Sequence, residues 1–84
     1  MAFRITTSVG KVTTLKIDGE FAREGVAELE KACASVDGPL DLDLSELVKA
    51  DAEGVRALKN LIGSGARLVA ASLYMELLLK KEEA

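Results

Sequence analysis

The chain has 84 residues, a formal net charge of −3, no histidine and one cysteine. This length fits a single domain, and a mildly acidic chain with few aromatic residues excludes the basic, base-stacking surface that nucleic-acid binding needs. One cysteine excludes an internal disulfide, and no apolar run approaches the roughly 20 residues of a membrane-spanning helix. We therefore expect one domain over residues 1–84, in a reducing, cytoplasmic compartment and without membrane insertion.

The first 20 residues predict a β-hairpin. Phe3, Ile5 and Thr7 alternate with polar residues, a turn follows at 9–11, and the alternation resumes from Val12 to about Asp18. A second turn at 18–20 is expected to end the hairpin. From Ala22 the apolar residues recur at helical spacing and predict a first helix. Its apolar stripe comprises Ala22, Val26, Leu29, Cys33 and Val36, which makes Cys33 a buried, unreactive thiol rather than a nucleophile.

The centre of the chain changes from strand to helix. Leu40 to Leu44 alternates strictly and predicts a third strand, which a polar turn ends. Asp51, a good N-cap residue, then begins a second helix that runs to about Ile62. Its buried stripe is expected to contain Val55, Leu58 and Ile62.

The last third predicts a short strand over 67–71 and a helix over 73–81, which gives the order ββαβαβα. The alternating strands favour helices on only one face, since strands covered on both faces are apolar throughout. We therefore predict an α/β fold with a mixed sheet of about four strands and about three helices on one face. The open face is expected to carry Arg4, Thr6, Thr14, Lys16, Asp41 and Asp43.

Three segments resemble the STAS domains, the family of anti-sigma factor antagonists. Residues 15–21 (Leu-Lys-Ile-Asp-Gly-Glu-Phe) resemble the family's entry to the first helix, and residues 40–45 (Leu-Asp-Leu-Asp-Leu-Ser) resemble its central strand. Residues 65–69 (Gly-Ala-Arg-Leu-Val) are similar to its fourth strand. The resemblance covers nearly the whole chain and implies a STAS-like fold, although family members usually continue beyond the third helix.

The resemblance also implies a regulatory site at the start of the second helix. The family's Asp-Ser-Ser-Gly signature aligns with Asp51-Ala52-Glu53-Gly54, so both serines are absent and Glu53 stands where the family is phosphorylated. Phosphoswitching at this position is therefore expected to be lost. Two interpretations of Glu53 stay open: it mimics part of the phosphoserine charge, or it is an ordinary first-turn acid that interacts favourably with the helix dipole.

The resemblance implies an adaptor that binds another protein and catalyses nothing, with no cofactor and no metal. The expected partner is a GHKL-type anti-sigma serine kinase or a related signalling protein. An alternative is a small STAS subunit that docks on the ATPase of a lipid-trafficking ABC transporter. The expected docking residues are Asp51, Ala52, Glu53, Gly54, Arg56, Lys59 and Asn60.

An enzyme is the alternative from a different class. Asp41-Leu42-Asp43 resembles the Asp-x-Asp strand of haloacid dehalogenase-like phosphotransferases, and a metal-dependent phosphohydrolase would place Asp41, Asp43 and Asp51 around Mg²⁺. That fold needs a much longer chain, so we expect solvated aspartates instead. The absence of histidine also removes the commonest general base.

The last helix is apolar on more than one side. Residues 73–79 (Leu-Tyr-Met-Glu-Leu-Leu-Leu) contain more apolar side chains than one packed stripe can bury. Two interpretations remain open: a homodimer forms through this helix, or the helix simply closes a small core.

Overall fold

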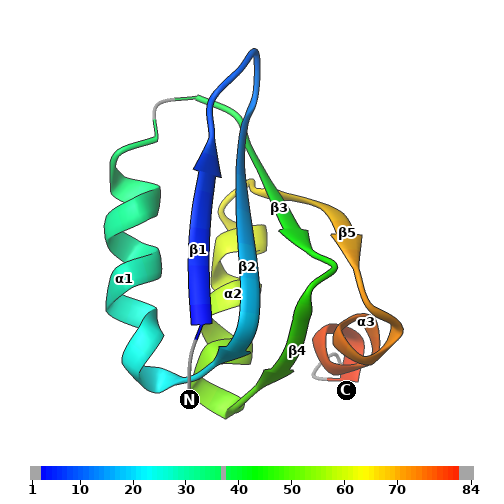
Figure 1. Cartoon of the computed structure of the whole chain (residues 1–84). Helices are drawn as coiled ribbons and strands as arrows, with labels where there is room; N and C mark the ends of the chain where they lie inside the picture. The colour runs from blue at the N-terminus through cyan, green and yellow to red at the C-terminus, as the bar shows by residue number, and fades with distance from the viewer. Residues whose placement is uncertain (1–2, 37, 82–84) are drawn as a thin grey trace.

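The computed structural model describes residues 3–36 and 38–81, which form a five-stranded sheet and three helices (Figure 1). The elements are β1 (Phe3–Ser8), β2 (Thr13–Phe21), α1 (Arg23–Ala34), β3 (Leu40–Leu44), β4 (Leu47–Ala50), α2 (Ala52–Gly63), β5 (Arg67–Ala71) and α3 (Leu73–Lys81). The predicted mixed α/β fold is confirmed, and the predicted bounds of β3, β5 and α3 agree with the structure.

The sheet is built around β2. This strand pairs antiparallel with β1 and parallel with both β3 and β4, and β5 pairs parallel with β3. The register places Leu15 beside Leu42, and Leu42 beside Leu68. Because alternate residues of a strand share a face, this register gathers the apolar residues of neighbouring strands on one side.

The helices cover that apolar side. Leu15, Ile17 and Leu42 are fully buried, and α1 and α2 contribute Leu29 and Leu58 to the same cluster. In Figure 1, α2 lies behind the sheet, α1 stands to the left of β1, and α3 lies at the right, where it contacts β4 and β5. Across residues 3–36 and 38–81, no helix has the length and apolarity that crossing a bilayer requires.

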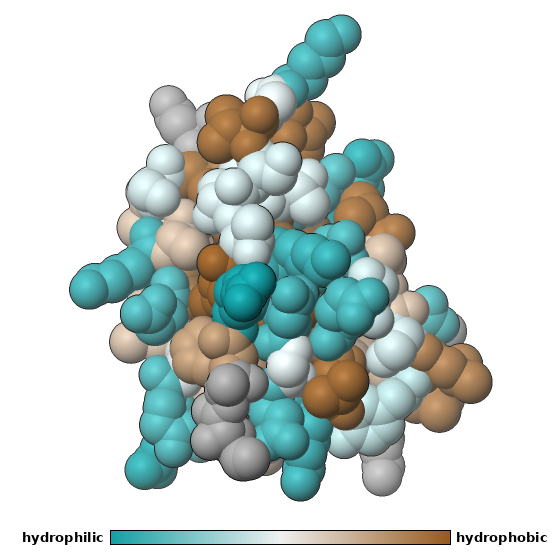
Figure 2. All heavy atoms as spheres, viewed as in Figure 1, coloured by the Kyte–Doolittle hydropathy of each residue, from teal (hydrophilic) through white to brown (hydrophobic). Residues whose placement is uncertain are grey.

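The opposite face of the sheet is polar, as predicted. Figure 2 shows hydrophilic side chains gathered at the centre of this face. Arg4 and Thr6 are exposed, and the other predicted residues (Thr14, Lys16, Asp41 and Asp43) are half-buried. Asp41 accepts hydrogen bonds from the Arg67 guanidinium of the adjacent strand at 3.3 and 3.4 Å.

Two predictions about the strands are wrong. The predicted turn at 18–20 is absent because β2 continues through it to Phe21, with a register shift next to Gly19, whose φ is +89°. β4 was not predicted, because only Leu47 and Ala50 of its four residues are shielded and the pattern does not alternate. The prediction of a polar turn after β3 is confirmed: Asp43 accepts hydrogen bonds from Ser45 N (3.0 Å) and Oγ (2.7 Å). Those same bonds lower the pKa of Asp43.

Candidate functional site

The start of α2 is fixed by Asp51, as the capping pattern predicts. Its backbone is extended, and its Oδ1 accepts a hydrogen bond from Gly54 N at 2.8 Å. The N–H of Asp51 donates to the carbonyl of Phe21 at 3.1 Å, which ties the same residue to the end of β2. The side chain therefore satisfies one of the free donors at the helix start, while the backbone anchors it to the sheet.

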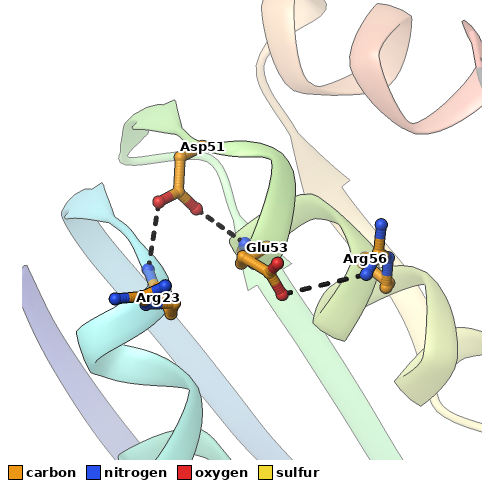
Figure 3. A network of polar contacts seen from close by, with 5 residues as sticks. Arg23, Asp51, Glu53 and Arg56 are labelled. Carbon is orange, nitrogen blue, oxygen red and sulfur yellow. Dashed lines mark hydrogen bonds and ion pairs between the residues drawn. The ribbon is translucent and has the colours of Figure 1, made fainter.

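Asp51 also caps a second helix. Its other oxygen, Oδ2, accepts a hydrogen bond from the backbone N–H of Arg23, the first residue of α1, at 3.1 Å (Figure 3). The N-cap position of α1 is Ala22, whose side chain offers no acceptor. One carboxylate thus serves the starts of two helices. Sequence reasoning missed this contact, since 28 positions separate the two residues and no local pattern joins them.

Gly54 is buried, so it contributes packing rather than exposed surface. A Cβ at this position would lie 2.8 Å from the Phe21 carbonyl oxygen and 2.9 Å from its Cδ2. On the other side, a Cβ at Gly25 would lie 2.9 Å from Phe21 Cε1. Two helices therefore approach the Phe21 ring through glycines, and Phe3 meets the same ring edge-on with centroids 5.9 Å apart.

The other predicted docking residues lie mainly at the surface. Ala52, Glu53, Arg56 and Asn60 are exposed, and Lys59 is half-buried. Glu53 Oε1 and Arg56 Nη1 are 3.9 Å apart, an exposed ion pair one turn apart on the helix (Figure 3). Such a pair contributes only a few tenths of a kcal/mol to stability, so both side chains are available to a partner.

A groove of about 470 Å³ runs between α1 and α2, and we call it the α1–α2 groove. Its lining comprises Val26, Leu29, Glu30 and Cys33 from α1, Glu53, Arg56, Ala57, Asn60 and Leu61 from α2, and Ser64. Apolar side chains thus alternate with charged and amide groups, a mixture typical of protein-binding surfaces. Burial, and then the nearby Glu30 carboxylate, raise the pKa of the Cys33 thiol, which favours its unreactive form.

A second hollow, of about 480 Å³, lies beside the Asp51 carboxylate. It is lined by Phe3, Glu20, Phe21, Ala22, Glu24, Lys49 and Asp51. The three acidic residues here are not close enough together to form a metal site; within residues 3–36 and 38–81 no three acidic, cysteine or histidine side chains converge in that way.

The aspartates of the enzyme alternative are separated and already hydrogen-bonded. Asp41 pairs with Arg67, Asp43 accepts from Ser45, and Asp51 caps the two helices beyond β4. These three carboxylates do not gather into a cluster that could hold a metal ion, as the phosphohydrolase alternative would need.

Comparisons with known proteins support the fold. No protein-family model matches the sequence, and no curated protein matches it. Among solved structures, the chain is similar to an anti-sigma factor antagonist, a STAS domain from Rhodobacter sphaeroides, with a TM-score of 0.55 and 19% sequence identity. The similarity covers 87% of this chain and 89% of the other. The protein therefore has the fold of a STAS domain.

Proposed function

We propose that this protein is a regulatory adaptor that binds a signalling protein through the start of α2 and the α1–α2 groove. The observation that carries the proposal is the exposed start of α2, with Ala52 and Glu53 in the first turn and Arg56 in the next, beside an open groove. Asp51 and the packing of Gly54 hold this turn in place, so little conformational freedom is lost on binding.

The partner in this proposal is a GHKL-type anti-sigma serine kinase or a related signalling protein. Its support is the STAS fold of the chain, shared with a solved anti-sigma factor antagonist. The segment from residue 51 to 54 contains no hydroxyl group, so binding is constitutive and does not respond to phosphorylation there. Glu53 supplies one negative charge at the helix start, less than the charge of a phosphoserine.

The first experiment tests the docking surface with purified proteins. Kinase-type anti-sigma factors encoded by the source genome are titrated with wild type and Arg56→Glu, and affinity is measured by calorimetry. Arg4→Glu on the open sheet face is the matched control, because it makes the same charge change on an exposed residue. We expect a loss of about tenfold or more for Arg56→Glu and little change for the control. Equal losses, or a loss for Arg4→Glu alone, would place the docking surface elsewhere.

The second experiment tests the absence of a switch. The protein is incubated with ATP and the kinase that it binds, and its intact mass and tryptic peptides are measured. Wild type should gain no phosphate on residues 51–54, whereas Glu53→Ser restores a hydroxyl and should become phosphorylated and then release the kinase. Release of wild type on addition of ATP, with phosphate elsewhere in the chain, would contradict constitutive binding.

An ATPase subunit of a lipid-trafficking ABC transporter is the alternative partner, and binding of wild type to one purified partner and not the other distinguishes the two. A purified ATPase that binds wild type and loses affinity for Arg56→Glu, while the anti-sigma kinases do not bind, would replace the kinase proposal. The docking surface on α2 would be retained in that case.

A further inference from the structure

The α1–α2 groove has an apolar floor that the fold leaves partly uncovered. Val26 and Cys33 of α1, and Ala57 and Leu61 of α2, are half-buried: each packs against the core cluster and also lines the groove. Val26 and Cys33 are two helical turns apart, so the floor extends about 10 Å along α1. A strip of this length matches the apolar stripe of one short helix.

The walls of the groove restrict the backbone conformation of an occupant. Both walls are helices, whose backbone groups bond within the helix itself. The neutral polar residues of the lining are Asn60 and Ser64, and Ser64 Oγ already donates to the Asn60 carbonyl at 3.0 Å. An extended peptide would therefore leave most of its N–H and C=O groups without partners in the groove. A helix satisfies its own backbone and presents only side chains, so a helix is the occupant that fits.

The two walls also carry exposed charges of both signs. Glu30 is the charged lining residue of α1, and within residues 3–36 and 38–81 no lysine or arginine nitrogen lies within 4 Å of its carboxylate. Its charge helps to raise the pKa of the Cys33 thiol, which places it near the floor. On the α2 wall, Arg56 makes one long contact with Glu53, at 3.9 Å (Figure 3). A helix in the groove thus meets a carboxylate on one flank and a guanidinium on the other.

We propose that the α1–α2 groove receives an amphipathic helix of the partner protein. The apolar stripe of that helix covers the floor, with a basic residue on the flank toward Glu30 and an acidic residue on the flank toward Arg56. The inference rests on the proposed function, since it names the part of the partner that binds there. Asp51 joins the starts of both walls, so the groove exists before the helix enters. Charges beside an apolar seam then set the direction in which the helix lies, as in coiled coils.

The first test uses a helix without the rest of any partner. The probe is a lactam-bridged helical peptide of about 12 residues, with an apolar stripe, lysines on one flank and glutamates on the other. It is titrated to about 5 mM into isotope-labelled protein and followed by NMR, which detects millimolar affinity. The amide signals of Val26, Ala57 and Leu61 should shift, and those of the open sheet face should not. No shifts in the groove, or equal binding of a matched peptide with glutamates on both flanks, would overturn the proposal.

Charge reversals test how the helix is held. Glu30→Arg and Arg56→Glu each give the two positions charges of the same sign, and each should weaken peptide binding about fivefold. The double variant exchanges the two charges, and the peptide can then lie in the reverse direction, so its affinity should return to within about twofold of wild type. Glu28→Arg, at an exposed α1 residue outside the groove, is the control and should have no effect. A double variant that shows the summed loss of the single variants would contradict pairing with both walls.

The same variants in the kinase titration separate this inference from the proposed function. An anti-sigma kinase that binds wild type should lose about fivefold in affinity with Glu30→Arg and nothing with Glu28→Arg. If no such kinase binds while the peptide behaves as described, the proposed function fails and the helix-binding groove is retained. If a kinase binds and Arg56→Glu weakens it, but the peptide does not enter the groove, the proposed function is retained and this inference fails.

Discussion

The start of α2 and the outer side of α3 are two exposed surfaces that differ in how many contacts within the chain hold them in place. At the start of α2, the Asp51 carboxylate accepts hydrogen bonds from the starts of two helices, and Gly54 packs against Phe21. At α3, Leu73 and Leu77 project from a helix whose inner side alone is packed. The first surface is held in place by contacts within the chain, whereas the second consists of apolar side chains that remain exposed.

Because of this difference, substitutions at the two surfaces should affect the free energy of unfolding differently. Substitutions at the structural residues of the α2 start should lower the free energy of unfolding of the monomer. Substitutions on the outer side of α3 should leave that free energy nearly unchanged, because Leu73 and Leu77 are exposed. Measurements of unfolding at low protein concentration therefore test the distinction directly, since association is then negligible.

The largest expected effect is that of Gly54→Ala. Its Cβ would meet the Phe21 carbonyl oxygen at 2.8 Å, and a backbone atom cannot move aside as a flexible side chain can. We expect a loss of about 2–3 kcal/mol in unfolding free energy, measured by urea denaturation. Gly63→Ala, in the same helix with open space around it, is the control and should gain about 0.5 kcal/mol. Similar values for the two variants would show that the approach to Phe21 does not constrain α2.

Asp51→Ala is expected to have the next largest effect. It removes the acceptors for Gly54 N and Arg23 N together, and loss of an N-cap costs about 1–2 kcal/mol. Asp51→Asn retains one acceptor oxygen and should lose less. Glu53→Ala, an exposed first-turn acid, should change stability by about 0.5 kcal/mol or less. A loss for Glu53→Ala as large as that for Asp51→Ala would contradict the assignment of Asp51 as the shared cap.

The third prediction concerns Asp43, whose hydrogen bonds join it only to Ser45, two residues away. The hydrogen bonds from Ser45 lower the pKa of Asp43 in the folded protein, so its contribution is present above the unfolded pKa of about 4 and is lost as pH falls through the lower folded value. The stability difference between wild type and Asp43→Asn should therefore be largest near neutral pH and shrink below about pH 4. Urea denaturation of both proteins at several pH values measures this stability difference. A stability difference that does not change with pH would exclude a contribution from the charge of Asp43.

The smallest effect is expected at α3. Leu77→Gln should change the unfolding free energy of the dilute monomer by no more than about 0.5 kcal/mol, because the side chain is largely exposed. Met75→Gln, two residues away and fully buried, is the contrast and should be strongly destabilising. If Leu77→Gln unfolds the dilute protein as well, the outer stripe already has a partner within the chain.

The parts of the fold with strong periodicity could be predicted from sequence. β3 alternates cleanly and α2 begins at a good cap, and both lie where the pattern places them. β4 could not be predicted, since only two of its four residues are shielded and its pairing with β2 depends on a register shift at Gly19. The candidate site was predicted in its local parts, such as the Asp51 cap. The contact to Arg23 and the α1–α2 groove arise from tertiary packing and leave no local signal.

The turn at Ser45 has a consequence for the shape of the whole sheet. It lets one long strand, β2, pair with β3 along its first half and with β4 near its end, so β4 diverges from β5 (Figure 1). α3 fills the resulting wedge, where it contacts both strands and inserts Met75.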